Sequence, residues 1–165
     1  MTSFLSFSSH PSSTSLDRLC HAPLPRGLRE KAGHLSWDRF LATYGHRAGP
    51  VQLQDWQCTD GRGSSRGLGA QARHYQATLT VGGRTETICV SATGPIAALT
   101  AMLYELGIAL EVLDFHQLQM GRDTVTFIRG TAGVGDEWAM AWAEDNTHAA
   151  LRAVIACANA LAGPE

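Results

Sequence analysis

The sequence predicts an α+β fold of two βββα units, with antiparallel sheets, helices on one side of each sheet and a pseudo-twofold axis between the units. Two observations carry this prediction. Apolar residues alternate along three short stretches after residue 49 and then recur at helical spacing, and the same order is written a second time. Because one three-stranded unit with one helix buries its apolar face poorly, we expect the two units to pack together and the chain to be dimeric.

Length and composition limit the classes of protein to consider. The chain has 165 residues, of which 44% are hydrophobic, and this suits one compact domain. A formal net charge of -2 without a basic stripe argues against nucleic acid as a partner, and the apolar runs are too short to cross a membrane. The N-terminus does not resemble a secretory signal, and the four cysteines form no Cys-x-x-Cys pair. We therefore expect a cytoplasmic protein with reduced thiols, no metal and no other cofactor.

The chain divides into three segments. Residues 1–30 are rich in Ser and Pro and are expected to be disordered, or ordered only by a partner. Residues 31–48 are expected to hold a linker helix, in which Ser36 caps Trp37–Tyr44. Residues 49–163 are expected to form the folded domain. The helix places four apolar residues on one face, Trp37, Phe40, Leu41 and Tyr44.

In the first unit, three alternating stretches predict strands. Gly82-Gly83 is a two-residue hairpin signal. Gly94-Pro95 opens a helix, because proline at the first helical position gives up no hydrogen bond, and Gly107 ends it. The expected strands are Val51–Trp56, Ala72–Val81 and Thr85–Ala92.

The second unit repeats this order. A final helix is capped by Asp145 or Asn146, stops at Gly163-Pro164 and has Cys157 on its apolar face. Trp138 and Trp142 share one face of the last strand, which suits either a core or dimer interface or a platform for a ligand. The expected strands are Leu110–Leu118, Thr124–Arg129 and Glu137–Ala143.

Three further patterns give no site. The glycine-rich stretch 59–69 lacks the Lys-Ser/Thr of a phosphate-binding loop and does not open a helix, so we interpret it as a loop between strands. The seven histidines show no metal-ligand spacing. The Gly-x-Ser-x-Gly spacing at residues 63–67 falls inside this glycine-rich stretch and does not open a helix, so it is not a nucleophile elbow, and we assign no catalytic residue.

The order and spacing of several pieces resemble a known family. The pieces are Thr93-Gly94-Pro95-Ile96-Ala97-Ala98, Leu106-Gly107, Val112-Leu113-Asp114-Phe115 and Thr147–Val154. Together with the strands before them, they resemble the C-terminal regulatory domain of α-isopropylmalate synthases, the leucine-binding dimerisation domain, over residues 49–162. The resemblance implies two βββα units, pairing of two chains and an effector pocket near the dimer interface. The catalytic barrel of that family has no counterpart here, so the resemblance implies a standalone regulatory domain.

The resemblance also implies the site residues. The helix N-terminus offers free N–H groups to a carboxylate, and the small residues there let the ligand approach the backbone. Asp114 could face an ammonium group of the ligand. Trp142 falls at an apolar position of the pocket. Ala92 and Ala139–Trp142 depart from the family pattern, so the sequence does not fix which ligand the pocket binds. It allows a smaller ligand than leucine, a different ligand, or none. The implied ligand-binding residues are Gly94, Ile96, Ala97, Val112, Asp114, Phe115 and Trp142.

These observations predict a non-catalytic homodimeric regulatory domain that binds leucine, another small amino acid or a keto acid, or that regulates a separate synthase subunit in trans. One alternative is an interaction subunit that has lost the ligand. Another is an enzyme that has recruited the former effector pocket for new chemistry, with Asp114, His116 or Glu144 as acid–base groups.

Overall fold

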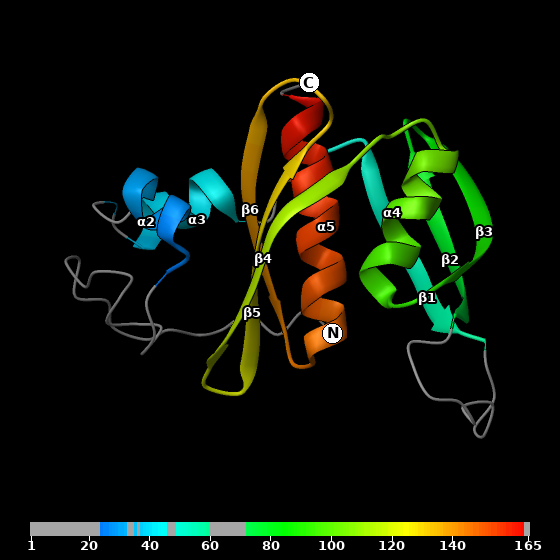
Figure 1. Cartoon of the computed structure of the whole chain (residues 1–165), viewed down its shortest axis with the longest axis horizontal. Helices are drawn as coiled ribbons and strands as arrows, with labels where there is room; N and C mark the ends of the chain where they lie inside the picture. The colour runs from blue at the N-terminus through cyan, green and yellow to red at the C-terminus, as the bar shows by residue number, and fades with distance from the viewer. Residues whose placement is uncertain (1–23, 33–34, 36, 46–48, 60–71, 164–165) are drawn as a thin grey trace.

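The structure is a computed structural model that describes residues 24–32, 35, 37–45, 49–59 and 72–163 (Figure 1). Two βββα units follow a pair of short helices in the described chain, which confirms the α+β class and the predicted order of elements within each unit. The helices are α2 (Arg26–Ala32), α3 (Trp37–Tyr44), α4 (Pro95–Glu105) and α5 (Asn146–Ala162). The strands are β1 (Val51–Cys58), β2 (Arg73–Val81), β3 (Arg84–Ala92), β4 (Glu111–Met120), β5 (Asp123–Thr131) and β6 (Asp136–Ala143).

Each unit forms its own antiparallel sheet. Sheet A has the order β1-β2-β3 and sheet B the order β4-β5-β6. The predicted hairpin at Gly82-Gly83 joins β2 to β3, and both glycines have positive φ angles, 58° and 83°. A two-residue turn of this kind matches the right-handed twist of the strands, which explains why the glycine pair fixes the register.

The first strand of each unit carries a β-bulge at a corresponding place. The register shifts between Leu53 and Asp55 in β1, and between Val112 and Asp114 in β4. A bulge changes which residues share a face of the sheet. Beyond the bulge in β4, Phe115 pairs with Ile128 of β5, a residue of the core beside α5. The matching bulges are compatible with a repeated βββα unit.

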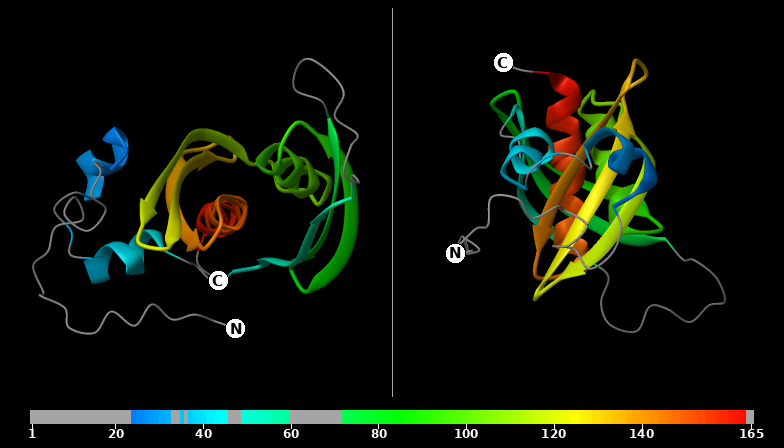
Figure 2. Two further views of the ribbon diagram at one scale, coloured as in Figure 1. Left: turned by 90° about the horizontal axis from the view of Figure 1, so that it is seen from below. Right: turned by 90° about the vertical axis from the view of Figure 1, so that its left-hand side faces the viewer.

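The two long helices lie between the two sheets (Figure 2, left view). Helix α4 packs on sheet A, α5 packs on sheet B, and the two helices contact each other. Both contribute to one apolar core, in which Leu99, Met102 and Leu103 of α4 are fully buried. The predicted burial of Cys157 in α5 is confirmed. This arrangement explains how two units that are too small alone share one core.

A buried asparagine links the end of the chain to its first strand. The Asn159 side chain of α5 accepts a hydrogen bond from the Val51 N–H and donates one to the Val51 carbonyl, each at 3.0 Å. The chain passes so close that a Cβ at Gly49 would lie 2.5 Å from Asn159. Glycine at position 49 therefore permits this contact, which joins residues 108 positions apart.

The N-terminal region differs from the prediction. Helix α3 is confirmed, but residues 24–30, expected to be disordered, include most of a second helix, α2. The reason is tertiary, because Leu24 and Leu28 are each 1% exposed and bury against sheet B. Helices α2 and α3 cover the face of sheet B away from α5, so the prediction of helices on one side of each sheet is wrong for sheet B. Residues 1–23, Ser36 and most of the glycine-rich stretch lie outside the described residues.

Candidate functional site

A pocket of about 300 Å³ opens where the N-termini of α4 and α5 meet strand β4. Its lining comes from both units: the turn into α4, the middle of β4 and the first turn of α5. The lining residues are Thr93, Gly94, Pro95, Ile96, Ala97, Phe115, Gln117, Asn146, Thr147 and Ala150. No charged side chain is among these described residues.

On the α4 side of the pocket, backbone amides of the first helical turn find no backbone partner in the described part of the chain. Gly94 is the N-cap in an extended conformation and provides no side-chain cap, and Pro95 follows at the start of the helix. The first intrahelical bond that closes the turn runs from the Ala98 N–H to the Gly94 carbonyl, at 3.0 Å. The N–H groups of Ile96 and Ala97 therefore belong to the first turn, where no helix carbonyl is available to them.

The α5 side is capped by its own chain. Asp145 accepts hydrogen bonds from the backbone N–H of His148 at 2.8 Å and from the His148 ring. Burial of the Asp145 carboxyl acts to raise its pKa, but the bonds from His148 outweigh that effect and leave the pKa below its ordinary value. Of the two caps that the sequence allowed, Asp145 or Asn146, Asp145 is thus the one observed, and its carboxylate already has a partner.

A polar network holds the floor of the pocket in place. The Gln117 amide donates to the Thr126 hydroxyl at 3.0 Å and to the Asn146 carbonyl at 2.8 Å. Thr124 donates to the Asn146 side chain at 2.7 Å. Gln117 uses both amide hydrogens in these bonds, so its remaining capacity is as an acceptor. Beside it, Phe115 is 43% exposed and presents an aromatic surface.

The electrostatic character of the pocket follows from this geometry. Each helix N-terminus carries a partial positive charge from its aligned peptide dipoles. At this pocket the α4 end has no side-chain cap, whereas the Asp145 carboxylate offsets the α5 end, and none of the described lining residues contributes a negative side chain. The pocket is therefore suited to a small anion with an apolar part, such as a carboxylate.

Four of the seven site residues implied by the resemblance line this pocket. They are Gly94, Ile96, Ala97 and Phe115. The other three lie elsewhere. Val112 packs against the main core, and Asp114 forms an ion pair with Arg129 of β5.

Asp114 does not lie among the pocket-lining residues. The hydrogen bonds from Arg129 to Asp114 and then Asp136 raise the pKa of the guanidinium. His116 pairs across the strands with Phe127, which belongs to the apolar cluster under α2 and α3. Because alternate residues of a strand face opposite sides, Asp114 and His116 share the face away from Phe115. The structure does not bring Asp114, His116 and Glu144 together in the pocket lining.

Trp142 packs on the other side of sheet B. It is partly buried against the cluster of α2, α3 and sheet B, which also contains Trp138 at 4% exposure. Ala139 and Ala141 occupy the α5 side of the same strand. The alternation of β6 therefore turns both indoles away from the pocket, and Trp138 belongs to a core.

Sequence reasoning missed the part of the lining that comes from α5 and Gln117. Gln117 could have been found, because it lies two positions after Phe115 and so on the same face. Asn146, Thr147 and Ala150 were identifiable as the first turn of a helix. Their position beside the α4 N-terminus depends on the packing of two units, and no local pattern specifies that packing.

Comparison with protein-family models and with curated proteins finds no match to this chain. Within the described residues, no group of three or more His, Cys, Asp or Glu side chains could hold a metal ion. Across the same part of the chain, every helix is too short or too polar to cross a membrane.

Proposed function

We propose that this chain is a homodimeric, non-catalytic regulatory domain that binds a small carboxylate at the pocket between α4 and α5. The observation that carries the proposal is the uncapped N-terminus of α4, which opens into a pocket with no charged side chain among its described lining residues. The resemblance to the regulatory domain of α-isopropylmalate synthases supports the same site, because Gly94, Ile96 and Ala97 match the effector-binding helix start of that family.

In this proposal the carboxylate accepts hydrogen bonds from the N–H groups of Ile96 and Ala97, where the helix dipole also favours it. The apolar part of the ligand packs against Phe115 and Ala150. A volume of about 300 Å³ lies at the lower end for ligand pockets and limits the ligand to a small molecule.

The charge of the lining favours a keto acid over an amino acid. An α-ammonium group would face the positive end of α4, while Asp114 is held by Arg129 and Asp145 by His148. A 2-oxo acid has the same carboxylate without that cation. We therefore propose a branched 2-oxo acid as the preferred class, with leucine as the weaker competitor.

The homodimer is proposed on the free edge of sheet B. Strand β4 is an edge strand of its sheet, and its Leu113 and Phe115 are 41% and 43% exposed. Long edge strands with exposed apolar residues favour pairing with another chain. A second copy at this edge would lie next to Phe115 and so next to the mouth of the pocket. Antiparallel pairing of the two β4 strands would relate the two chains by a twofold axis.

The test is calorimetric titration of the full chain with 4-methyl-2-oxopentanoate and with leucine, which share one carbon skeleton. Ala97→Glu places a carboxylate at the pocket while a negative charge still suits the first helical turn. We expect this variant to weaken binding of the oxo acid by at least about ten-fold, since like charges at close range are repelled. Ala101→Glu, one turn further along at an exposed position of α4, is the matched control and should bind as the parent does.

Two results would contradict the proposal. If the parent chain takes up neither compound, the pocket is not a carboxylate site. If Ala97→Glu binds as tightly as Ala101→Glu, the ligand binds somewhere else. Tighter binding of leucine than of the oxo acid would reverse only the preference between the two classes.

A further inference from the structure

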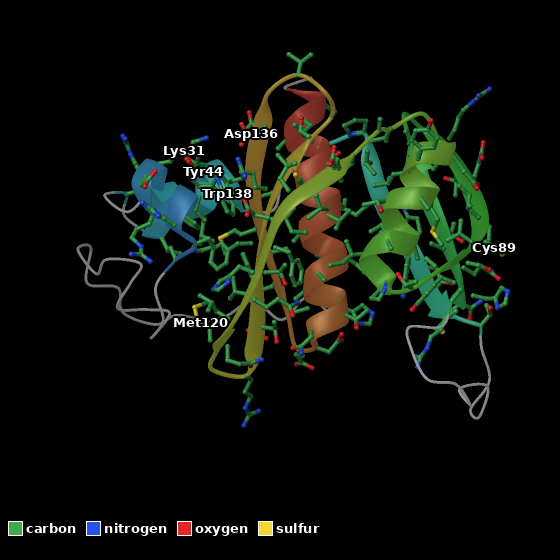
Figure 3. The ribbon with its side chains drawn as sticks, viewed as in Figure 1. Lys31, Tyr44, Cys89, Met120, Asp136 and Trp138 are labelled. Atoms are coloured by element: carbon green, nitrogen blue, oxygen red, sulfur yellow. The ribbon has the colours of Figure 1, made fainter. Side chains whose placement is uncertain are left out.

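Helices α2 and α3 form a separate layer on the outer face of sheet B. We call the described residues 24–45 the cap. Leu24, Leu28 and Phe40 of the cap are buried, and the rings of Phe40 and Phe127 meet edge-on with centroids 6.3 Å apart. Figure 3 shows Trp138 and Tyr44 where the cap meets β6. The sheet residues beneath the cap are Val125, Phe127, Trp138 and Met140, with Leu118, Met120 and Trp142 partly covered.

The cap has little order of its own. Helices α2 and α3 contain seven and eight residues, and helices shorter than about 12–15 residues are marginal in water. Three of its polar contacts stay inside the cap: Arg26 with Glu30, Arg29 with the Leu24 carbonyl, and Thr43 with the Arg39 carbonyl. The cap is therefore helical because its apolar side chains dock on sheet B.

Docking buries a polar group that finds no partner among the described residues. The indole Nε1 of Trp138 is buried and makes no hydrogen bond within the described part of the chain. Helix α2 lies directly over it, since a Cβ at Gly27 would be 3.4 Å from the Trp138 ring. A buried N–H without an acceptor loses the hydrogen bond that water would give it. This loss opposes docking of α2, and it is relieved when the cap lifts and water reaches the indole.

The rest of the domain is held differently. Helix α5 has seventeen residues, ten of them buried, and lies between the two sheets. Its N-terminus is capped by Asp145, and Asn159 bonds it to β1. Helix α5 is long, buried and bonded at both ends, whereas α2 and α3 are short helices on one face of sheet B, and this difference predicts two levels of local stability in one chain.

We propose that the cap opens as one unit from sheet B while the two βββα units stay folded. The opening exposes the Trp138 face of sheet B to solvent. Solvent exposure of this apolar surface is therefore controlled by a segment of the same chain. The device is separate from the carboxylate pocket, which lies on the other side of sheet B and uses none of the cap residues.

Hydrogen–deuterium exchange of the full chain, followed by mass spectrometry of its peptides, tests the proposal. We expect the amides of α2 and α3 to exchange together, at least about ten-fold faster than those of α5. Equal protection of the cap and α5 would overturn the proposal, because the cap would then open only in global unfolding.

The Gly27→Ala variant distinguishes opening of the whole cap from separate fraying of its helices. Gly27→Ala favours the helical state of α2 and adds a methyl at ordinary contact distance from Trp138. We expect exchange to slow by about five-fold in α2 and also in α3, which the substitution does not touch. Slowing confined to α2 would show independent fraying and would reject the concerted cap.

Trp138→Phe removes the unpartnered N–H, and Trp142→Phe is the matched control on the same face. We expect the first to slow cap exchange relative to the control, with α5 exchange as the internal reference for global stability. Faster cap exchange in Trp138→Phe than in the control, at unchanged α5 exchange, would show that the buried indole N–H does not drive opening.

Discussion

At the residue scale, burial decides the chemistry of the described cysteines. Cys157 is buried in α5, and desolvation, together with the nearby charge of Glu137, raises the pKa of its thiol to about 12. Cys58 and Cys89 lie exposed on sheet A, where Figure 3 labels Cys89. Because the thiolate is the reactive form, thiol reagents should distinguish these positions.

We expect a thiol reagent at pH 8 to label Cys58 and Cys89 in the native protein and to leave Cys157 unlabelled until the chain unfolds. With a pKa of about 12, only roughly one Cys157 in ten thousand would be a thiolate at that pH. Mass spectrometry of labelled peptides gives the rates, and urea-unfolded protein is the control. Labelling of native Cys157 at the rate of Cys89 would show that α5 is less well packed than described.

At the element scale, the N-terminus of α5 depends on Asp145. Its pKa is lowered in the folded state, so its contribution to stability is complete above the unfolded value of 3.8 and is lost as the pH falls through the lower folded value. Removing an N-cap side chain costs about 1 kcal/mol. Asn at this position keeps a cap but has no charge to titrate.

We therefore expect Asp145→Ala to lose about 1 kcal/mol of unfolding free energy at pH 7. The stability difference between the parent and Asp145→Ala should shrink as the pH falls below 3.8. Asp145→Asn is the control, and urea unfolding measured at several pH values gives the comparison. A difference that stays constant down to pH 2 would mean that the carboxylate charge is not what stabilises the helix.

At the scale of the whole molecule, Asn159 joins the C-terminal helix to the first strand. Replacing it by Ala leaves the Val51 N–H and carbonyl without these partners in a buried place. Leaving a buried polar group unpaired costs about 1–3 kcal/mol, so we expect Asn159→Ala to lose at least about 2 kcal/mol. Gly49→Ala should also be destabilising, because its Cβ would overlap the Asn159 side chain and displace it from Val51.

Denaturant unfolding measures this effect, with the exposed Gln57→Ala as a control that should change stability little. A single transition that moves to lower denaturant is expected if the two units share one core. Two separate transitions in Asn159→Ala would also fit loss of the link. An unchanged midpoint would refute the role given to Asn159.

The same scales separate what could be predicted from what could not. The strands and helices of both units were predictable because alternation and helical spacing are local, and turns such as Gly82-Gly83 allow only a few geometries. The turn into α4 was predictable as an amide-rich end because Gly94 and Pro95 specify it. The positions of Val112, Asp114 and Trp142 were not, because the bulge in β4 and the choice of face in β6 depend on packing.

The sequence by itself determined the α+β class, the repeated βββα order and one wall of the candidate pocket. The tertiary structure alone decided that the α5 N-terminus completes the pocket, that Asp114 pairs with Arg129, and that residues 24–30 fold into a cap. The physical reason is the distance along the chain over which each kind of interaction acts. Periodicity, capping and turn chemistry act over a few residues, whereas these outcomes depend on apolar faces and charges that meet only after the chain has folded.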